Sequence, residues 1–248
     1  MGKQRVVFKS CRRVFCLLII GTLFGVAEPA QAQFGLQGGL NFLLGFPQDE
    51  FDDNVEENGA GIAGEFLYSP RSTPLGFGLS FGYLNYGRES RREPFSSTIP
   101  DVTVEVVTTN NILLGHLLLR AQSKKGVLQP YVDGLVGFSY LFTETEIKDI
   151  DDPDFAGLVS SKNLDDAVFS YGGGGGLMIK VYTGKTKREN QPRMWSVLID
   201  LKMHYLVGGE AEYLKKGSVR RSDGKVSYDI IKSKTDLLTA QIGVAVSF

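Results

Sequence analysis

The residues of this chain that are best suited to acid–base chemistry are its two histidines, His116 and His204. An imidazole beside a serine or an aspartate can serve as a general base in hydrolysis or acyl transfer. Both histidines lie in alternating stretches, about residues 103–120 and 195–207, that are typical of β-strands. Counted from the strand ends at about 3.3 Å per residue and a tilt of about 40°, they differ in height by more than ~10 Å. We therefore expect that they do not share a site and that the chain is not an enzyme, although a site built on His204 and a loop serine or aspartate stays open.

A run of five glycines, Gly172–Gly176, and the tripeptide Gly184-Lys185-Thr186 could suggest a phosphate-binding loop. The nucleotide-binding pattern needs a glycine five positions before Gly184, where this chain has Ile179, and a helix after the lysine. No helical periodicity follows this segment. We expect no nucleotide and no other cofactor.

Acidic side chains are concentrated in two polar segments, residues 47–59 and 143–166. Oxygen-rich loops suit Ca²⁺, so the stretch from Asp149 to Asp154 could bind a divalent cation. It lacks the glycine and the terminal glutamate of the EF-hand pattern, so we expect a solvated loop and no metal site. The 27 basic and 28 acidic residues of the chain nearly balance, which argues against a nucleic-acid partner.

The first 32 residues have the pattern of a cleavable secretory signal. An apolar segment, residues 14–27, follows a basic one, and Pro29-Ala30-Gln31-Ala32 ends in small residues, which places cleavage between Ala32 and Gln33. The alternative is an uncleaved inner-membrane anchor, but the apolar run is shorter than the ~20 residues of a spanning helix. Both cysteines, Cys11 and Cys16, fall in this segment. We expect two parts, a signal peptide at 1–32 and one domain at 33–248.

The rest of the chain is dominated by a period of two, with apolar residues alternating with small or polar ones. In one of the clearest stretches, one parity carries Trp195, Val197, Ile199, Leu201, Met203, Tyr205 and Val207, and the other carries Ser196, Asp200, Lys202 and His204. The least clear contains residues 112–119, which are apolar on both parities. The eight predicted strands span residues 34–46, 60–69, 75–86, 103–120, 128–142, 167–182, 195–207 and 238–248.

The connections between these strands alternate between short and long. Short turns fall at 69–74, 121–126 and 183–193, and long polar loops at 47–59, 87–102, 143–166 and 208–236. In an up-and-down barrel with an even number of strands, all long loops then lie at one end. The sequence therefore predicts an all-β fold, a closed antiparallel up-and-down transmembrane β-barrel of about eight strands.

Two features favour a barrel with its apolar face toward lipid. Aromatic residues gather near both ends of the predicted strands, as membrane-interface girdles do. The polar parity carries charges that a narrow lumen would have to pair. The expected lumen network contains Glu65, Asp133, Asp200, Lys202 and His204, with Arg120 as a further charge. We expect this network to be a plug of ion pairs; an ion path is the alternative, and a soluble lipocalin-like barrel with the opposite orientation also stays open.

The signal peptide, the eight strands and the ending Ile242-Gly-Val-Ala-Val-Ser-Phe248 together resemble the OmpA/OmpX-type outer-membrane barrel domain. Ile242, Val244, Val246 and Phe248 are similar to the terminal signal that the outer-membrane assembly machinery reads in that family. An aromatic residue is common at the position of Val246, and this chain departs from that. The resemblance implies a bacterial outer-membrane location, with the assembly machinery, outer-membrane lipid and lipopolysaccharide as partners.

Taken together, these features predict a monomeric, non-enzymatic outer-membrane barrel with its long loops on the extracellular side. Its expected role is envelope structure or surface recognition through those loops. A conduit for small solutes or apolar ligands is the alternative within the same fold.

Overall fold

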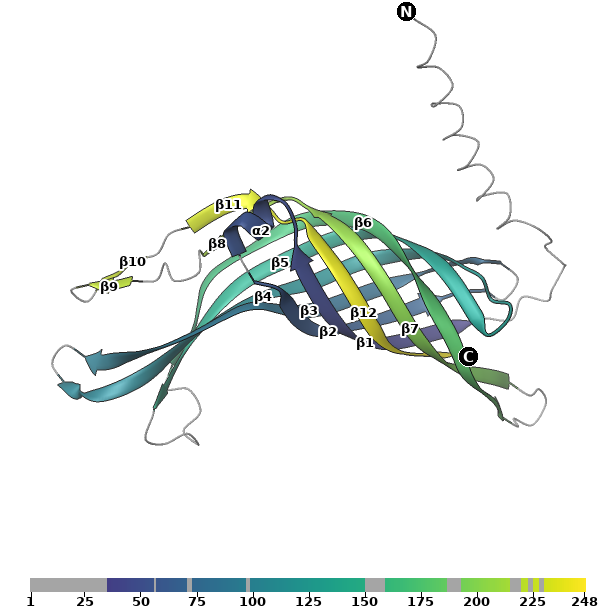
Figure 1. Cartoon of the computed structure of the whole chain (residues 1–248), viewed down its shortest axis with the longest axis horizontal. Coiled ribbons are helices and arrows are strands. Elements are labelled where there is room, and N and C mark those ends of the chain that lie inside the picture. The colour runs from purple at the N-terminus through teal and green to yellow at the C-terminus, as the bar shows by residue number, and fades with distance from the viewer. Residues whose placement is uncertain are drawn as a thin grey trace, which may run out of the picture.

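Eight strands close into an antiparallel barrel in a computed structural model, which describes residues 35–55, 57–70, 73–96, 99–149, 159–186, 193–214, 220–222, 225–227 and 230–248. The strands neighbour one another in the order β1-β12-β7-β6-β5-β4-β3-β2 (Figure 1), which confirms the predicted up-and-down fold. Residues 1–32 and the predicted cleavage site at Ala32 and Gln33 lie outside the described residues. The barrel strands are β1 (Leu36–Pro47), β2 (Gly59–Tyr68), β3 (Leu75–Ser96), β4 (Ile99–Gln122), β5 (Leu128–Asp149), β6 (Val159–Thr186), β7 (Arg193–Gly208) and β12 (Leu237–Ser247).

The apolar parity of the strands points outward. On β12, Ile242 and Val244 are about half exposed, whereas Thr239 and Ala245 on the other parity are buried. Leu40 on β1 is the most exposed of these apolar residues, at 69%. A soluble ligand-binding barrel has the reverse arrangement, so this orientation fits lipid on the outside. Among the described residues, no helix combines the length and the apolar character that a membrane crossing requires.

Glycines on the inward parity allow neighbouring strands to approach closely. A Cβ at Gly137 would lie 2.0 Å from the carbonyl oxygen of Gly115, and one at Gly243 would lie 2.1 Å from that of Leu40. No side chain fits at such a distance. The tight curvature of a small barrel therefore explains part of the high glycine content, 30 residues in all.

Strands β3, β5 and β6 continue well past their predicted ends, and β4 begins at Ile99 rather than at 103, which corrects the sequence prediction. Residues 87–102 and 143–166 were expected to be loops, but β3, β4, β5 and β6 stay paired there. Ser90 pairs with Val107, Val107 with Glu146, and Glu146 with Ser160. These paired arms project beyond the barrel at its long-loop end (Figure 1). Polar residues in this stretch hid the pairing, although its valines and threonines favour strands.

The two remaining long connections also contain secondary structure that the sequence analysis did not predict. The first includes the short helix α2 (Glu50–Val55), whose Phe51 and Val55 share one buried face. The last includes β8 (Glu210–Leu214) paired with β11 (Ile230–Lys234), and β9 (Arg220–Ser222) paired with β10 (Lys225–Ser227). In Figure 1, α2, β8 and β11 lie together over the long-loop end of the barrel.

The interior is apolar toward the long-loop end, a layer that the expectation of a polar lumen did not include. The ambiguous stretch in β4 shows why. Leu114 and Leu118 are buried inside this layer, whereas Leu113, Leu117 and Leu119 are 42–61% exposed on the outer wall. Both parities of this stretch are apolar because one parity packs in the apolar layer of the interior and the other lies on the apolar outer wall.

Candidate functional site

A charged cluster fills the middle of the barrel, with Arg120 of β4 at its centre. The Arg120 side chain is fully buried. Its Nε and Nη1 lie 2.8 Å from Asp133 Oδ1 and Glu65 Oε1, and its Nη2 donates to the second oxygen of each carboxylate. The guanidinium carbon lies 4.0 Å from the centre of the Tyr131 ring. One arginine therefore binds two carboxylates, each in a bidentate ion pair, which is the geometry that guanidinium groups favour.

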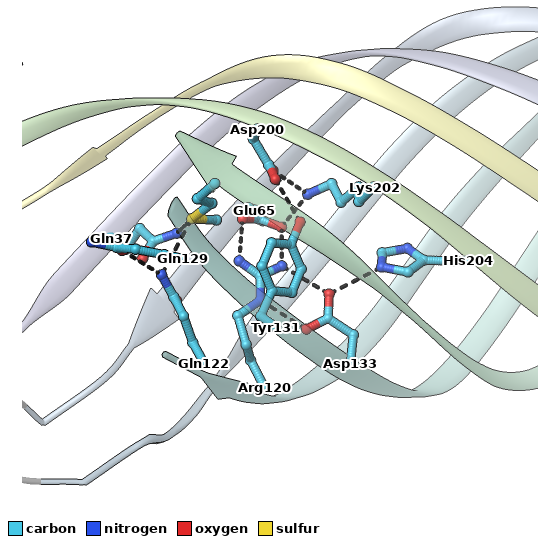
Figure 2. Close-up of polar contacts among 11 residues, drawn as sticks. Gln37, Glu65, Arg120, Gln122, Gln129, Tyr131, Asp133, Asp200, Lys202 and His204 are labelled. Carbon is cyan, nitrogen blue, oxygen red and sulfur yellow. Dashed lines mark hydrogen bonds and ion pairs between the residues drawn. The ribbon is translucent and has the colours of Figure 1, made fainter. Parts of the chain in front are cut away.

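The cluster extends from this centre to β7 (Figure 2). Lys202 Nζ lies 2.5 Å from Glu65 Oε2 and 3.0 Å from Asp200 Oδ2. The Tyr131 hydroxyl donates to Asp200 Oδ1 at 2.5 Å. On the other side, His204 Nε2 lies 3.0 Å from Asp133 Oδ2. Charges from four strands thus form one continuous network.

The structure brings together all five residues that the sequence analysis placed in a lumen network, along with Arg120. Strand register explains the meeting: Arg120 pairs with Asp133 across β4 and β5. Asp200, Lys202 and His204 follow one another at every second position of β7. Tyr131 was missed, although it shares the parity of Asp133 two residues earlier, which could have revealed it.

An amide layer lies on the short-turn side of the charged cluster, and sequence reasoning missed it. Gln122 Nε2 donates to Gln129 Oε1 at 3.1 Å, and Gln37 Nε2 lies 3.2 Å from Met178 Sδ. Figure 2 shows these side chains beside the ion pairs. All four residues are buried. Uncharged glutamines gave no signal because only the closed barrel places β1, β4, β5 and β6 around one axis.

The prediction that the two histidines are too far apart to share a site is wrong. Both line one small cavity, together with Leu114 and Leu135. Counting residues from strand ends ignored the stagger between tilted strands. His116 Nε2 lies 2.8 Å from Ser170 Oγ, but Ser170 is fully buried. This serine–histidine pair is therefore part of the packed interior.

The long-loop end is covered by an aromatic cap. The buried Phe51 of α2 packs against Tyr86 and Tyr213, with ring centres 5.6 and 5.5 Å away. The Tyr213 hydroxyl lies 2.7 Å from Ser233 Oγ on β11. Burial raises the pKa of Tyr213 above its ordinary value, so the hydroxyl stays neutral. The described interior is thus filled by amides, charges, aliphatic side chains and this cap in succession.

Aromatic pairs lie near both ends of the outer wall. Tyr68 packs on Phe77 and Tyr182 on Trp195 at the short-turn end, each with ring centres 5.2 Å apart. Toward the long-loop end the corresponding pairs are Phe169 with Tyr171 and Tyr140 with Phe142. Two bands of aromatic residues therefore flank the apolar wall, as interfacial girdles do.

Three residues of the expected assembly signal, Ile242, Val244 and Val246, lie on the outward parity of β12, and Phe248 directly follows the strand. Ile242, Val244 and Phe248 are about half exposed, and Val246 faces Gly38 of β1 and Val197 of β7. Their role as a signal stays a prediction. Divalent-cation binding at 149–154 also stays untested, because residues 150–158 lie outside the described ranges.

A closed antiparallel barrel with an apolar outer wall and a charged interior is a transmembrane β-barrel.

No protein-family model matches the chain, and no curated protein matches it. Several solved structures are similar to it, among them the following three. Neisserial surface protein A is 10% identical, with a TM-score of 0.37 over 88% of this chain and 98% of that one. A major outer membrane protein of Thermus thermophilus is 14% identical, with a TM-score of 0.34 over 85% and 99%. The translocator domain of the autotransporter NalP from Neisseria meningitidis is 9% identical, with a TM-score of 0.23 over 96% of each chain.

Proposed function

We propose that the chain is an integral barrel of a Gram-negative outer membrane, and that it is a closed, non-enzymatic scaffold for its long loops. The filled interior is the observation that supports this best. The fully buried Arg120 and Asp200 lie between the amide layer and the apolar layer. Such packing suits a support better than a conduit, since charges at membrane depth are stable only when they are partnered.

The paired arms give this scaffold its working surface. Strands β3 to β6 continue their hydrogen-bonded pairing beyond the barrel, so the arms are supported directly by the membrane-spanning wall. Rigid supports that present surface segments are typical of recognition proteins. The role in this proposal is envelope structure or surface contact, with the arms, α2 and the β8–β11 hairpin on the extracellular side.

Conductance across planar bilayers tests the closed barrel. The purified protein should insert without steady currents, since the charged side chains of the cluster are buried and paired with one another. Steady single-channel currents would contradict the closed scaffold and favour the solute conduit instead.

Labelling of intact cells tests the orientation. Asp53 on α2 and Lys125 in the β4–β5 turn are both exposed and lie at opposite ends of the barrel. Asp53→Cys should react with a maleimide that cannot cross membranes, and Lys125→Cys should react only after the cells are broken. The opposite result would show that the barrel has the reverse orientation in the membrane, with its short turns on the extracellular side.

A further inference from the structure

The two ends of the barrel carry opposite charge, and this separation is the basis of a further inference. At the short-turn end, residues 69–74, 121–130 and 180–194 contain eight basic residues and a single acidic one, Glu189. The four long connections at the other end, residues 47–59, 87–102, 143–166 and 208–236, together contain 22 acidic and 12 basic residues, a net negative charge. None of the counted residues belongs to the ion pairs of the barrel interior. A membrane protein with such polarity presents a basic surface to one leaflet.

Hydrogen bonds hold the short-turn segments side by side around the rim. Lys124 Nζ donates to the carbonyl oxygens of Pro70 and Thr73, which ties the β4–β5 turn to the β2–β3 turn. The Lys180 amide donates to the carbonyl oxygen of Val127 at 2.8 Å, which ties β6 to the same turn. These bonds place Lys124, Lys125 and Lys180 on one side of the rim, and the exposed Lys185 follows five residues further along β6. We call these four lysines the basic collar.

The collar lies just beyond the apolar wall. Val127 and Leu128, two and three residues after Lys125, are 60% and 58% exposed. A β-bulge between Lys180 and Tyr182 leaves both Val181 and Tyr182 more than half exposed, three to four residues before the exposed Lys185. Apolar and aromatic side chains followed by lysines are the arrangement found where hydrocarbon meets the headgroups.

We infer that the basic collar binds the anionic phosphate headgroups of the lipid leaflet at the short-turn end. The inference rests on the proposed membrane location and adds a lipid preference to it. Lysines close to an anionic lipid surface attract it electrostatically, and the attraction falls off within a Debye length. The connections at the other end have a net negative charge and give no such net attraction, so the preference should be confined to one leaflet.

Trp195 offers a direct probe because it is the only tryptophan of the chain and packs against Tyr182 in the aromatic band at the short-turn end. The purified protein would be refolded into phosphatidylcholine vesicles that contain a minor fraction of brominated lipid, which quenches tryptophan. The brominated lipid is either phosphatidylglycerol or phosphatidylcholine. We expect about twofold or stronger quenching by the anionic lipid at equal mole fraction, and we expect high salt to remove the difference.

Paired variants identify the groups responsible. Lys125→Gln with Lys185→Gln should bring quenching by the anionic lipid down to the zwitterionic level. Lys232→Gln with Lys234→Gln, which changes two exposed lysines at the long-loop end, should leave it unchanged. Equal quenching by both lipids in the wild-type protein would contradict the binding of anionic lipid by the basic collar but would leave the membrane location intact. Absence of quenching by either lipid would overturn the membrane location itself.

Discussion

Replacing Arg120 with methionine is the most direct test of the charged cluster. Methionine is unbranched and replaces the aliphatic part of the arginine side chain, so it removes the charged guanidinium while it keeps the packing of that part. The change deletes the hydrogen bonds that Arg120 donates to Glu65 and Asp133 and its contact with the Tyr131 ring. Two buried carboxylates then lose their shared cation. Breaking a buried pair in this way should lower the free energy of unfolding by about 3–5 kcal/mol.

A triple variant separates the lost charge from the lost volume. The substitutions Glu65→Gln and Asp133→Asn, combined with Arg120→Met, remove the charge of the arginine and of both carboxylates that it binds. The ion pair between Lys202 and Asp200, at 3.0 Å, remains balanced. Replacing a buried ionic group as a whole is often neutral or stabilising. We therefore expect the triple variant to recover most of the stability that the single variant loses, to within about 1–2 kcal/mol of the wild type.

An exposed ion pair provides the matched control. Lys232 Nζ lies 3.6 Å from Glu210 Oε2, and both side chains are about 60% exposed. Lys232→Met should cost less than about 1 kcal/mol, because water screens an exposed pair. The measurement is reversible urea unfolding in lipid vesicles, followed by the fluorescence of Trp195. An Arg120→Met protein as stable as the control variant, or a triple variant no better than the single one, would refute the electrostatic reasoning.

Three further predictions concern the wall and the N-terminus. Leu201→Arg places a cation on the outer wall and should cost about 2–4 kcal/mol in the same unfolding assay, the penalty for a cation near the bilayer midplane; a loss below that range would move Leu201 away from the midplane. Single cysteines at 197–205 should be reached by lipid-phase quenchers at odd positions only. Quenching at even positions would show that the other face of the strand contacts lipid, which contradicts the proposed orientation of the side chains. The mature protein from cell envelopes should begin at Gln33, and N-terminal sequencing that reads Met1 would rule out cleavage.

The strands of the barrel could be predicted because each has two unlike environments. Strand β7 was expected at 195–207 and spans Arg193–Gly208. Along it, Leu201 and Met203 contact the outside, while Asp200 and Lys202 are buried inside. A difference this large appears directly as a period of two. The same reasoning identified the charged residues of the interior without any knowledge of how the strands pair.

The parts that escaped prediction are those in which both faces of a strand have similar surroundings. In the β3 arm, the neighbouring residues Arg88 and Glu89 lie on opposite faces of the strand and both are charged, so no alternation marks the pairing of this stretch with β4. The cap was hidden for a different reason. Helix α2 has six residues, too few to show helical periodicity, and it is stabilised by Phe51 against the rings of Tyr86 and Tyr213. Contacts between distant segments, which the sequence does not reveal, determine these elements.

The charged cluster also has a structural role that the hydrophobic pattern alone could not fulfil. Apolar residues line the outside along every strand, so a slip of two residues between β4 and β5 would keep each face apolar or polar as before. It would, however, separate Arg120 from Asp133, its partner in the register. Since an unpaired charge in the sealed interior costs several kcal/mol, the cluster penalises such a slip strongly. The same ion pairs that fill the lumen therefore select one register among those that the alternation permits.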